Sequence, residues 1–132
     1  MVQQLEQAMQ SSGRVPDAVL SGHVHNYQRF TRTINERDVP FVVTGAGGFW
    51  KPSSMQKDNQ GNPLQTPYQF SDLGVTLASY CDDHYGYLLM EVTPQTLTGR
   101  YFAVPGLRES PSTPVRCIDT FTLDLTTHKL TS

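Results

Sequence analysis

The tetrapeptide Gly22-His23-Val24-His25 contains the residues of this sequence that are best suited to chemistry. If the segment is extended, His23 and His25 point to the same face, with their Cα atoms about 6.5–7 Å apart. Two imidazoles placed in this way can bind two metal ions about 3.5–4 Å apart, or chelate one ion together. Gly22 would permit an unusual backbone angle just before them. The spacing alone also fits two surface histidines, or two histidines with structural partners.

The residues before this motif predict how it is positioned. Residues 16–22 contain a short apolar run closed by Gly22, which is typical of a buried strand that ends in a tight turn. The end of a strand is the usual place for a site in an α/β sheet. A short helix is predicted over residues 2–11, where apolar side chains recur at helical spacing until a Ser-Ser-Gly sequence ends it.

Most of the remaining chain predicts β-strands. They are expected at residues 40–44, 85–93, 96–104 and 116–125. Residues 27–38 are expected to form an irregular exit, a short strand and a turn at Asn35 to Asp38. In the last of these, Phe121, Leu123 and Leu125 alternate and form an apolar face. The sequence Gly45-Ala46-Gly47-Gly48 indicates a loop whose backbone is strained or closely approached by other atoms.

A long polar loop is predicted over residues 50–75. Its first part, residues 50–72, has no apolar periodicity and is rich in Ser, Gln, Asn, Pro and Gly. Within it, the segment Asp58–Pro67 offers Leu64 as its single apolar anchor, so we expect this segment to be mobile.

Composition excludes several classes of function. The 132 residues are expected to form one domain (1–132), and 10 basic against 12 acidic side chains give a net charge of −2. Such a chain has no basic field to attract a polyanion, so no nucleic-acid partner is expected. No apolar run approaches the roughly 18–20 residues of a membrane span, and the N-terminus lacks the layout of a signal peptide. Cys81 and Cys117 allow either one disulfide or two buried free thiols.

The stretch from Asp17 to Arg29 closely resembles the last metal motif of the calcineurin-like metallophosphoesterases. The purple acid phosphatase branch is nearest, since its Gly-His-x-His strand end is also followed by an aromatic residue, an acidic or amide residue and Arg. Residues 40–48 resemble the next strand and glycine-rich turn of the family, and residues 85–92 with their hairpin resemble its closing antiparallel strands. The likeness covers about residues 15–48 and 85–125.

This resemblance implies an α/β fold, namely the C-terminal portion of a calcineurin-like phosphoesterase sandwich. The strand-like runs make it a mostly antiparallel or mixed β-sheet with one short N-terminal helix. The resemblance also implies that His23 binds one metal ion and His25 another, as part of a dinuclear site that hydrolyses phosphate esters. The two ions are divalent or trivalent, and His ligands suit Fe, Zn and Mn alike.

The chain departs from the family in one decisive respect. The other ligands of the family come from earlier motifs: an Asp at a strand end, a Gly-Asp pair, an Asn-His pair and a further His. None of these fits into the short segment before the His motif, where Glu6 and Asp17 are the acidic residues. The sequence Asp82-Asp83-His84 contains an Asp-x-His, but it follows the His motif, and we expect these residues to be solvated.

We therefore expect a C-terminal segment of a metallophosphoesterase whose N-terminal metal-binding half is absent. Alone, it should bind metal weakly or not at all and have little or no phosphoesterase activity. The alternatives are a non-catalytic binding or assembly module that retains a relic metal motif, and a truncated reading frame. Loss of the N-terminal half would expose sheet surface, so a homo-oligomer is expected. Neither the substrate nor the location follows from the sequence, although the related branch is often secreted or periplasmic.

Overall fold

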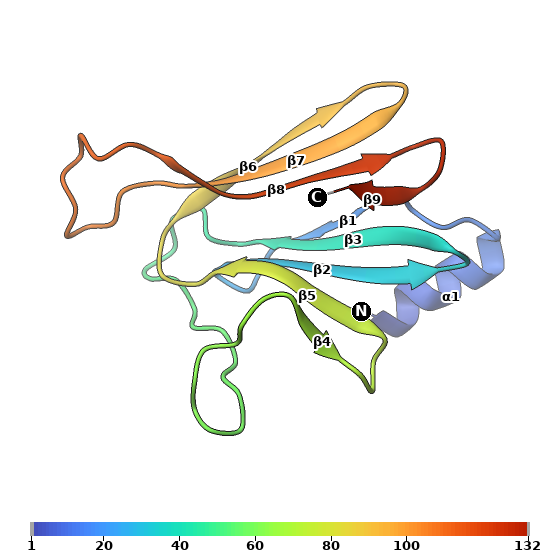
Figure 1. Cartoon of the computed structure of the whole chain (residues 1–132), viewed down its shortest axis with the longest axis horizontal. Coiled ribbons are helices and arrows are strands. Elements are labelled where there is room, and N and C mark those ends of the chain that lie inside the picture. The colour runs from blue at the N-terminus through green and yellow to red at the C-terminus, as the bar shows by residue number, and fades with distance from the viewer. Residues whose placement is uncertain (1, 132) are drawn as a thin grey trace.

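A computed structural model describes residues 2–131 as a mixed α/β structure with one short helix and two β-sheets (Figure 1). The elements are α1 (Val2–Ser12), β1 (Val19–Ser21), β2 (Tyr27–Ile34), β3 (Arg37–Thr44), β4 (Tyr68–Phe70), β5 (Val75–Cys81), β6 (Gly86–Val92), β7 (Thr96–Ala103), β8 (Arg116–Asp124) and β9 (Lys129–Thr131). The first sheet has the order β1-β3-β2-β5-β4, and the second has the order β6-β7-β8-β9.

The first sheet is built around the hairpin of β2 and β3. Tyr27 lies opposite Thr44 at its open end, and Ile34 lies opposite Arg37 at its closed end. The turn residue Asn35 has a φ of 49°, which matches the handedness that tight β-hairpin turns need. Strand β1 pairs with β3 in parallel and forms an edge of the sheet, whereas β5 pairs antiparallel with β2 on the other side. The sheet is therefore mixed.

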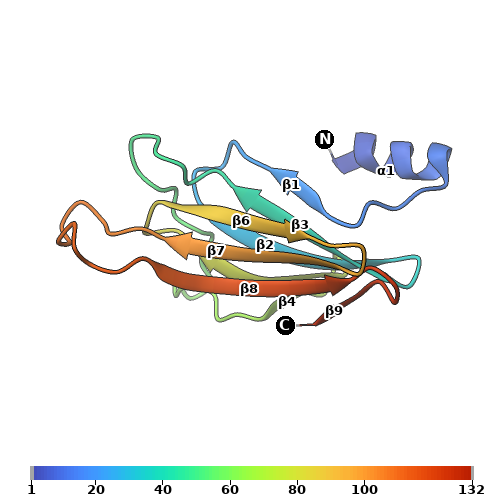
Figure 2. The ribbon, with the colours of Figure 1, turned by 90° about the horizontal axis from the view of Figure 1, so that it is seen from above.

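The second sheet is antiparallel throughout and lies over the first. Figure 2 shows β6, β7 and β8 stacked above β2 and β3, while α1 lies at the side of β1. The core between the layers consists of residues from both sheets: Tyr27, Val42, Cys81, Tyr101, Ala103 and Phe121. The rings of Tyr27 and Tyr101 stack across this boundary with centroids 3.9 Å apart and planes inclined by 9°.

A buried ion pair also joins the two sheets. Arg29 of β2 donates to both carboxylate oxygens of Asp119 of β8, at 2.6 and 2.9 Å, and the side chains are only 8% and 9% exposed. The hydroxyl of Tyr27 donates to the same carboxylate at 2.7 Å. Burial, together with the negative charge of Asp119, raises the pKa of Tyr27, so the phenol keeps the proton that it donates. The guanidinium carbon of Arg29 lies 5.1 Å from the ring centroid of Phe121.

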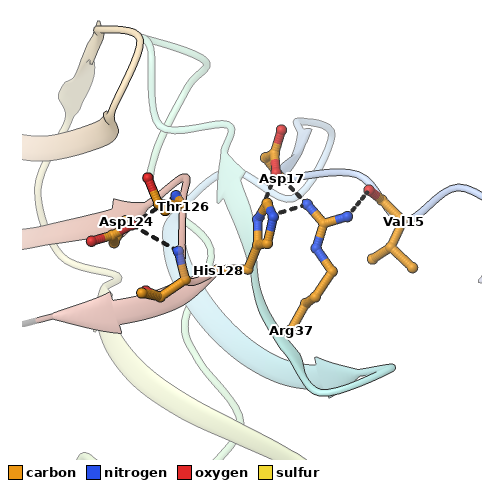
Figure 3. Close-up of polar contacts among 7 residues, drawn as sticks. Val15, Asp17, Arg37, Asp124, Thr126 and His128 are labelled. Carbon is orange, nitrogen blue, oxygen red and sulfur yellow. Dashed lines mark hydrogen bonds and ion pairs between the residues drawn. The ribbon is translucent and has the colours of Figure 1, made fainter.

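A second set of polar contacts holds the opposite end of the sheets together (Figure 3). Arg37, beside the β2–β3 turn, contacts Asp17 Oδ1 at 2.6 Å and His128 Nδ1 at 2.8 Å through Nη2, and it donates to the Val15 carbonyl through Nη1. The side chain of Asp124 accepts the backbone N–H groups of the turn that leads to His128. This network fixes the β8–β9 turn to the segment that precedes β1.

The sequence-based expectations hold for the coarse architecture and fail for several strands. The predicted helix at 2–11 is observed as α1, and Phe121 and Leu123 are buried as expected. Within residues 27–38 the irregular exit is wrong, because the expected short strand is observed as the whole of β2, which begins at Tyr27 and pairs with strands on both sides. The expected turn is observed at Asn35 and Glu36. The strands β5 and β9 differ from the expectation, since their sequences mix polar and apolar residues. The partner of β5, strand β2, is also distant in sequence, whereas β9 is a short strand that forms a hairpin with β8.

The polar segment 50–75 contains more structure than a loop. It includes β4, which pairs with β5, and a bridge between Lys57 and Pro63. Leu64 is buried, and its carbonyl accepts the hydroxyl of Tyr80 at 3.0 Å. The mobility expected for Asp58–Pro67 stays a prediction.

The expectations for the cysteines and for association have different outcomes. Both cysteines are free thiols, but Cys81 is buried whereas Cys117 is exposed, so the expectation of two buried thiols is only half right.

A groove on the outer face of the first sheet, lined by Val19, Phe30 and Phe41 among others, leaves apolar surface open. Self-association through such a surface stays a prediction. Within residues 2–131, no helix combines the length and the apolar composition needed to cross a membrane.

The Arg29–Asp119 pair yields a test of how the two sheets are held together. Replacing Asp119 by Ala leaves a buried guanidinium without its counter-ion, so we expect the free energy of unfolding to fall by roughly 3–5 kcal/mol in urea denaturation. The matched control is Glu91→Ala, which removes an ion pair with Arg100 whose partners are 61% and 39% exposed. That change should cost less than about 1 kcal/mol. Equal losses in the two variants would contradict this assignment.

Candidate metal centre

The His motif lies where three segments of the chain come together at one end of the molecule. It connects β1 to β2, and Tyr27, the first residue of β2, pairs with Thr44 on one side and with Cys81 on the other. The chain that follows Thr44 and the chain that follows Cys81 therefore begin beside the motif. This end is opposite the β2–β3 turn and its contacts with His128, as Figure 1 shows.

The motif is bent, so the condition of an extended segment, under which His23 and His25 would point to the same face, is not met. The backbone N–H of Val24 donates to the Gly22 carbonyl at 3.0 Å, and that of Asn26 donates to the Val24 carbonyl at 2.8 Å. Each bond closes a turn of three residues. The unusual backbone angle falls on His23, with a φ of 75°, and not on Gly22. Such a φ is uncommon for a residue with a side chain, and strained residues of this kind cluster at functional sites.

Asn26 holds the bend in place from the inside. It is 1% exposed, and its side chain donates to the Ser53 carbonyl at 2.9 Å and accepts from Gln28 Nε2 at 2.8 Å. In return, the N–H of Ser53 donates to the His25 carbonyl at 2.7 Å. The hydrogen bonds of Ser53, at the start of the polar segment, thus stabilise the bent motif. The sequence predicted this segment as a loop but did not indicate the contact.

Gly45 allows the glycine-rich turn to approach the motif closely. Its N–H donates to the Asn26 carbonyl at 3.1 Å, and a Cβ at this position would lie 2.1 Å from the Val24 carbonyl oxygen. Only glycine fits such a contact. The expectation of close backbone approach is therefore confirmed at Gly45, whereas a Cβ at Gly47 would meet open space.

The two imidazoles differ in their surroundings. His23 is exposed, and His25 is half-buried against Phe49, with ring centroids 4.3 Å apart. Among residues 2–131, the group of His, Cys, Asp or Glu side chains whose ligand atoms lie within 4.8 Å of one another is Cys81, Asp83 and His84. Neither motif histidine belongs to it. The histidines thus have the donor chemistry for a metal, but the described residues place no third ligand with them.

The expectation that residues 82–84 are solvated holds for Asp83, whose side chain is 74% exposed, whereas Asp82 and His84 are half-buried. Asp82 accepts the N–H of Met55 at 2.7 Å. His84 Nδ1 contacts Asp83 Oδ1 at 2.7 Å, and His84 Nε2 contacts Glu109 Oε2 at 2.9 Å. The hydrogen bond to Asp83, and then the one to Glu109, raises the pKa of His84. The pKa of Glu109 is lowered by the N–H of Gly106 and then by His84.

Asp119, Cys81 and Glu109 belong to this end of the molecule, although the sequence did not indicate their contacts. Asp119 anchors the aromatic residue and the arginine that follow the His motif, but it lies 90 residues after Arg29. Glu109 is likewise 25 residues after His84. A usable signal was the spacing Cys-x-Asp-His, because Cys81 directly precedes the acidic pair. No protein-family model, curated protein or solved structure matches the chain.

The close approach at Gly45 yields a second test. In Gly45→Ala the new methyl group overlaps the Val24 carbonyl, so the motif must shift, and we expect a loss of about 1–3 kcal/mol in unfolding free energy. The ring signals of His23 and His25 in NMR spectra should move as well. Gly47→Ala is the control, since its methyl group meets open space. Unchanged His23 and His25 signals in Gly45→Ala would contradict the contact.

Proposed function

We propose that this chain supplies the last two histidine ligands of a dinuclear-metal phosphoesterase that hydrolyses phosphate esters. The observation that carries the proposal is the strained turn at His23, which lies just beyond the carboxyl end of β1, a strand paired in parallel with β3. The positive φ of His23 is an unfavourable backbone conformation, and the buried Asn26 and the close approach of Gly45 maintain it. Such strain is not expected in a loop that has no function. The calcineurin-like sandwich, of which this chain would be the C-terminal portion, belongs to the same proposal.

His23 and His25 are of a type that binds these metals, but two protein ligands are too few to complete the site. Imidazoles suit Fe, Zn and Mn, whereas catalytic zinc usually has three protein ligands, and the described residues place no third one beside His23 and His25. In the complete site, His23 would bind one ion and His25 the other. The remaining ligands must come from another segment or another chain.

The neighbouring residues have defined tasks in this proposal. When bound, the two ions lower the pKa of a water and hold the phosphoryl oxygens during hydrolysis. The hydrogen bond between Asn26 and Ser53 fixes the backbone of the His motif, and the ring of Phe49 sets the orientation of the His25 ring. Phe49 and Trp50 are 64% and 82% exposed, so apolar surface borders the histidine.

A non-catalytic binding or assembly module is the second candidate. It is favoured by the groove on the outer face of the first sheet, where Val19, Phe30, Phe41 and Val75 present apolar surface next to α1. Leu73, at its border, is 67% exposed. Exposed apolar surface of this kind is common at protein contacts. In this case the strained His motif would be a relic.

Metal titration tests whether His23 and His25 act as ligands. We expect Zn²⁺ or Mn²⁺ to shift or broaden the ring signals of both residues in NMR spectra, with weak affinity that falls at acidic pH because protonation removes the ligand. His128, at the opposite end of the sheets, should stay unchanged and serves as the internal control. The effect should disappear in His23→Ala and His25→Ala. If metal changes the ring signals of neither His23 nor His25, the proposal is contradicted.

A phosphatase assay tests the expected incompleteness of the site. With a generic aryl phosphate and added metal, the purified chain should show little or no turnover, because no bridging carboxylate is placed beside the histidines among residues 2–131. Metal-dependent turnover that is lost in both His23→Ala and His25→Ala would show that the chain, or a second copy of it, completes the site. That result would overturn the incomplete-site argument and support the activity itself.

A further inference from the structure

A second group of metal-ligating side chains lies outside the His motif, in the turn that carries the chain from β5 to β6. Cys81 is the last residue of β5, and Asp83 and His84 follow it before β6 begins at Gly86. Asp83 Oδ1 lies 3.5 Å from Cys81 Sγ and 2.7 Å from His84 Nδ1. From this arrangement we infer that Cys81, Asp83 and His84 form a Zn²⁺ site, with Sγ, a carboxylate oxygen and Nδ1 as ligands and water in the fourth position.

The spacing of the ligand atoms suits a tetrahedral ion. Zinc bonds of about 2.0–2.3 Å place neighbouring ligand atoms about 3.3–3.6 Å apart. The sulfur–oxygen separation of 3.5 Å already meets this value, and the three ligand atoms lie within 4.8 Å of one another. The oxygen–nitrogen separation of 2.7 Å must widen by roughly 0.6 Å. A small rotation of the exposed Asp83 side chain provides this change.

The orientation of His84 is fixed by a carboxylate that is not itself a ligand. His84 Nε2 contacts Glu109 Oε2 at 2.9 Å, and the same oxygen accepts the N–H of Gly106 at 2.6 Å. Metal-binding histidines almost always donate their second ring N–H to a carboxylate or carbonyl, which fixes the tautomer and leaves the other nitrogen for the metal. Here that other nitrogen is Nδ1, which faces Asp83 and therefore the proposed ion.

The sulfur of Cys81 lies at the buried end of β5, 3.5 Å from Asp83 Oδ1. Burial raises the pKa of this thiol, so a bound ion must displace its proton to gain the thiolate ligand. In the same core cluster, Tyr101 Oη is the buried side-chain polar atom without a partner among residues 2–131. Tyr101 Oη also lies against Gly86, where a Cβ would be 2.4 Å away, so an unsatisfied donor is present close to the turn.

The charges around the turn balance when zinc is bound. Zn²⁺ replaces the proton on the Cys81 thiol and the proton that His84 Nδ1 shares with Asp83. The thiolate, Asp83 and Glu109 then carry three negative charges, which match the ion and the guanidinium of Arg116, whose Nη2 lies 3.1 Å from His84 Nε2. A mixed sulfur, nitrogen and oxygen ligand set favours zinc over the hard cations Mg²⁺ and Ca²⁺.

Cobalt titration of the whole chain tests this site directly. Co²⁺ occupies zinc sites, and a thiolate ligand gives it a charge-transfer absorption band that histidines and carboxylates do not give. We expect this band to saturate at one Co²⁺ per chain and to vanish on addition of Zn²⁺. Cys81→Ser and His84→Gln should abolish it, whereas Cys117→Ser, the matched control on the exposed thiol, should retain it.

Two further variants keep the test independent of folding and of the phosphoesterase proposal. Glu109→Gln leaves the three ligands in place, and we expect about a 10-fold or larger increase in the Co²⁺ dissociation constant with the band retained. The double variant His23→Ala/His25→Ala should leave the band unchanged. No thiolate band in a chain that is folded by circular dichroism would overturn the inference. A band that persists in Cys81→Ser, or that depends on His23 and His25, would also overturn it.

Discussion

The arrangement of the two sheets depends on the carboxylate of Asp119, which is buried between them. Removing a charge from water is costly, and the cost is offset here by a guanidinium with two hydrogen bonds and by the hydroxyl of Tyr27. These partners come from β2 and the carboxylate from β8, so the contact sets how the two layers face each other. The stacked rings of Tyr27 and Tyr101 then fill the space beside it.

The same contact determines where the His motif stands. Arg29 and Tyr27 follow His25 by only a few residues, and their burial fixes the start of β2 against the second sheet. The chain between β1 and β2 must therefore turn within a short distance. It does so through two successive three-residue turns, with the strain placed on His23 and with Gly45 close to the Val24 carbonyl. The histidines are thus held by contacts in which their own side chains take little part.

Two groups of potential ligands result at one end of the molecule, and they differ in completeness. The His motif offers two imidazoles on a braced turn without a third ligand among the described residues, which suits a site shared with another segment. The β5–β6 turn offers sulfur, oxygen and nitrogen within one short sequence, with Glu109 orienting the histidine from a distant loop. The register that places Tyr27 opposite Cys81 brings the two groups to the same end of the first sheet.

The sequence by itself determined the local features: the helix at 2–11, the apolar strands around Val42 and Phe121, and the two histidines after a strand end. These follow from periodicity and composition, which act over a few residues. Only the tertiary structure decided the bend at His23, the pairing of β5 with β2 and the contacts of Asp119 and Glu109. Their physical causes are the buried Arg29–Asp119 pair, the surface contact between Glu109 and His84, and backbone contacts between segments that are distant in sequence. No local pattern encodes such contacts.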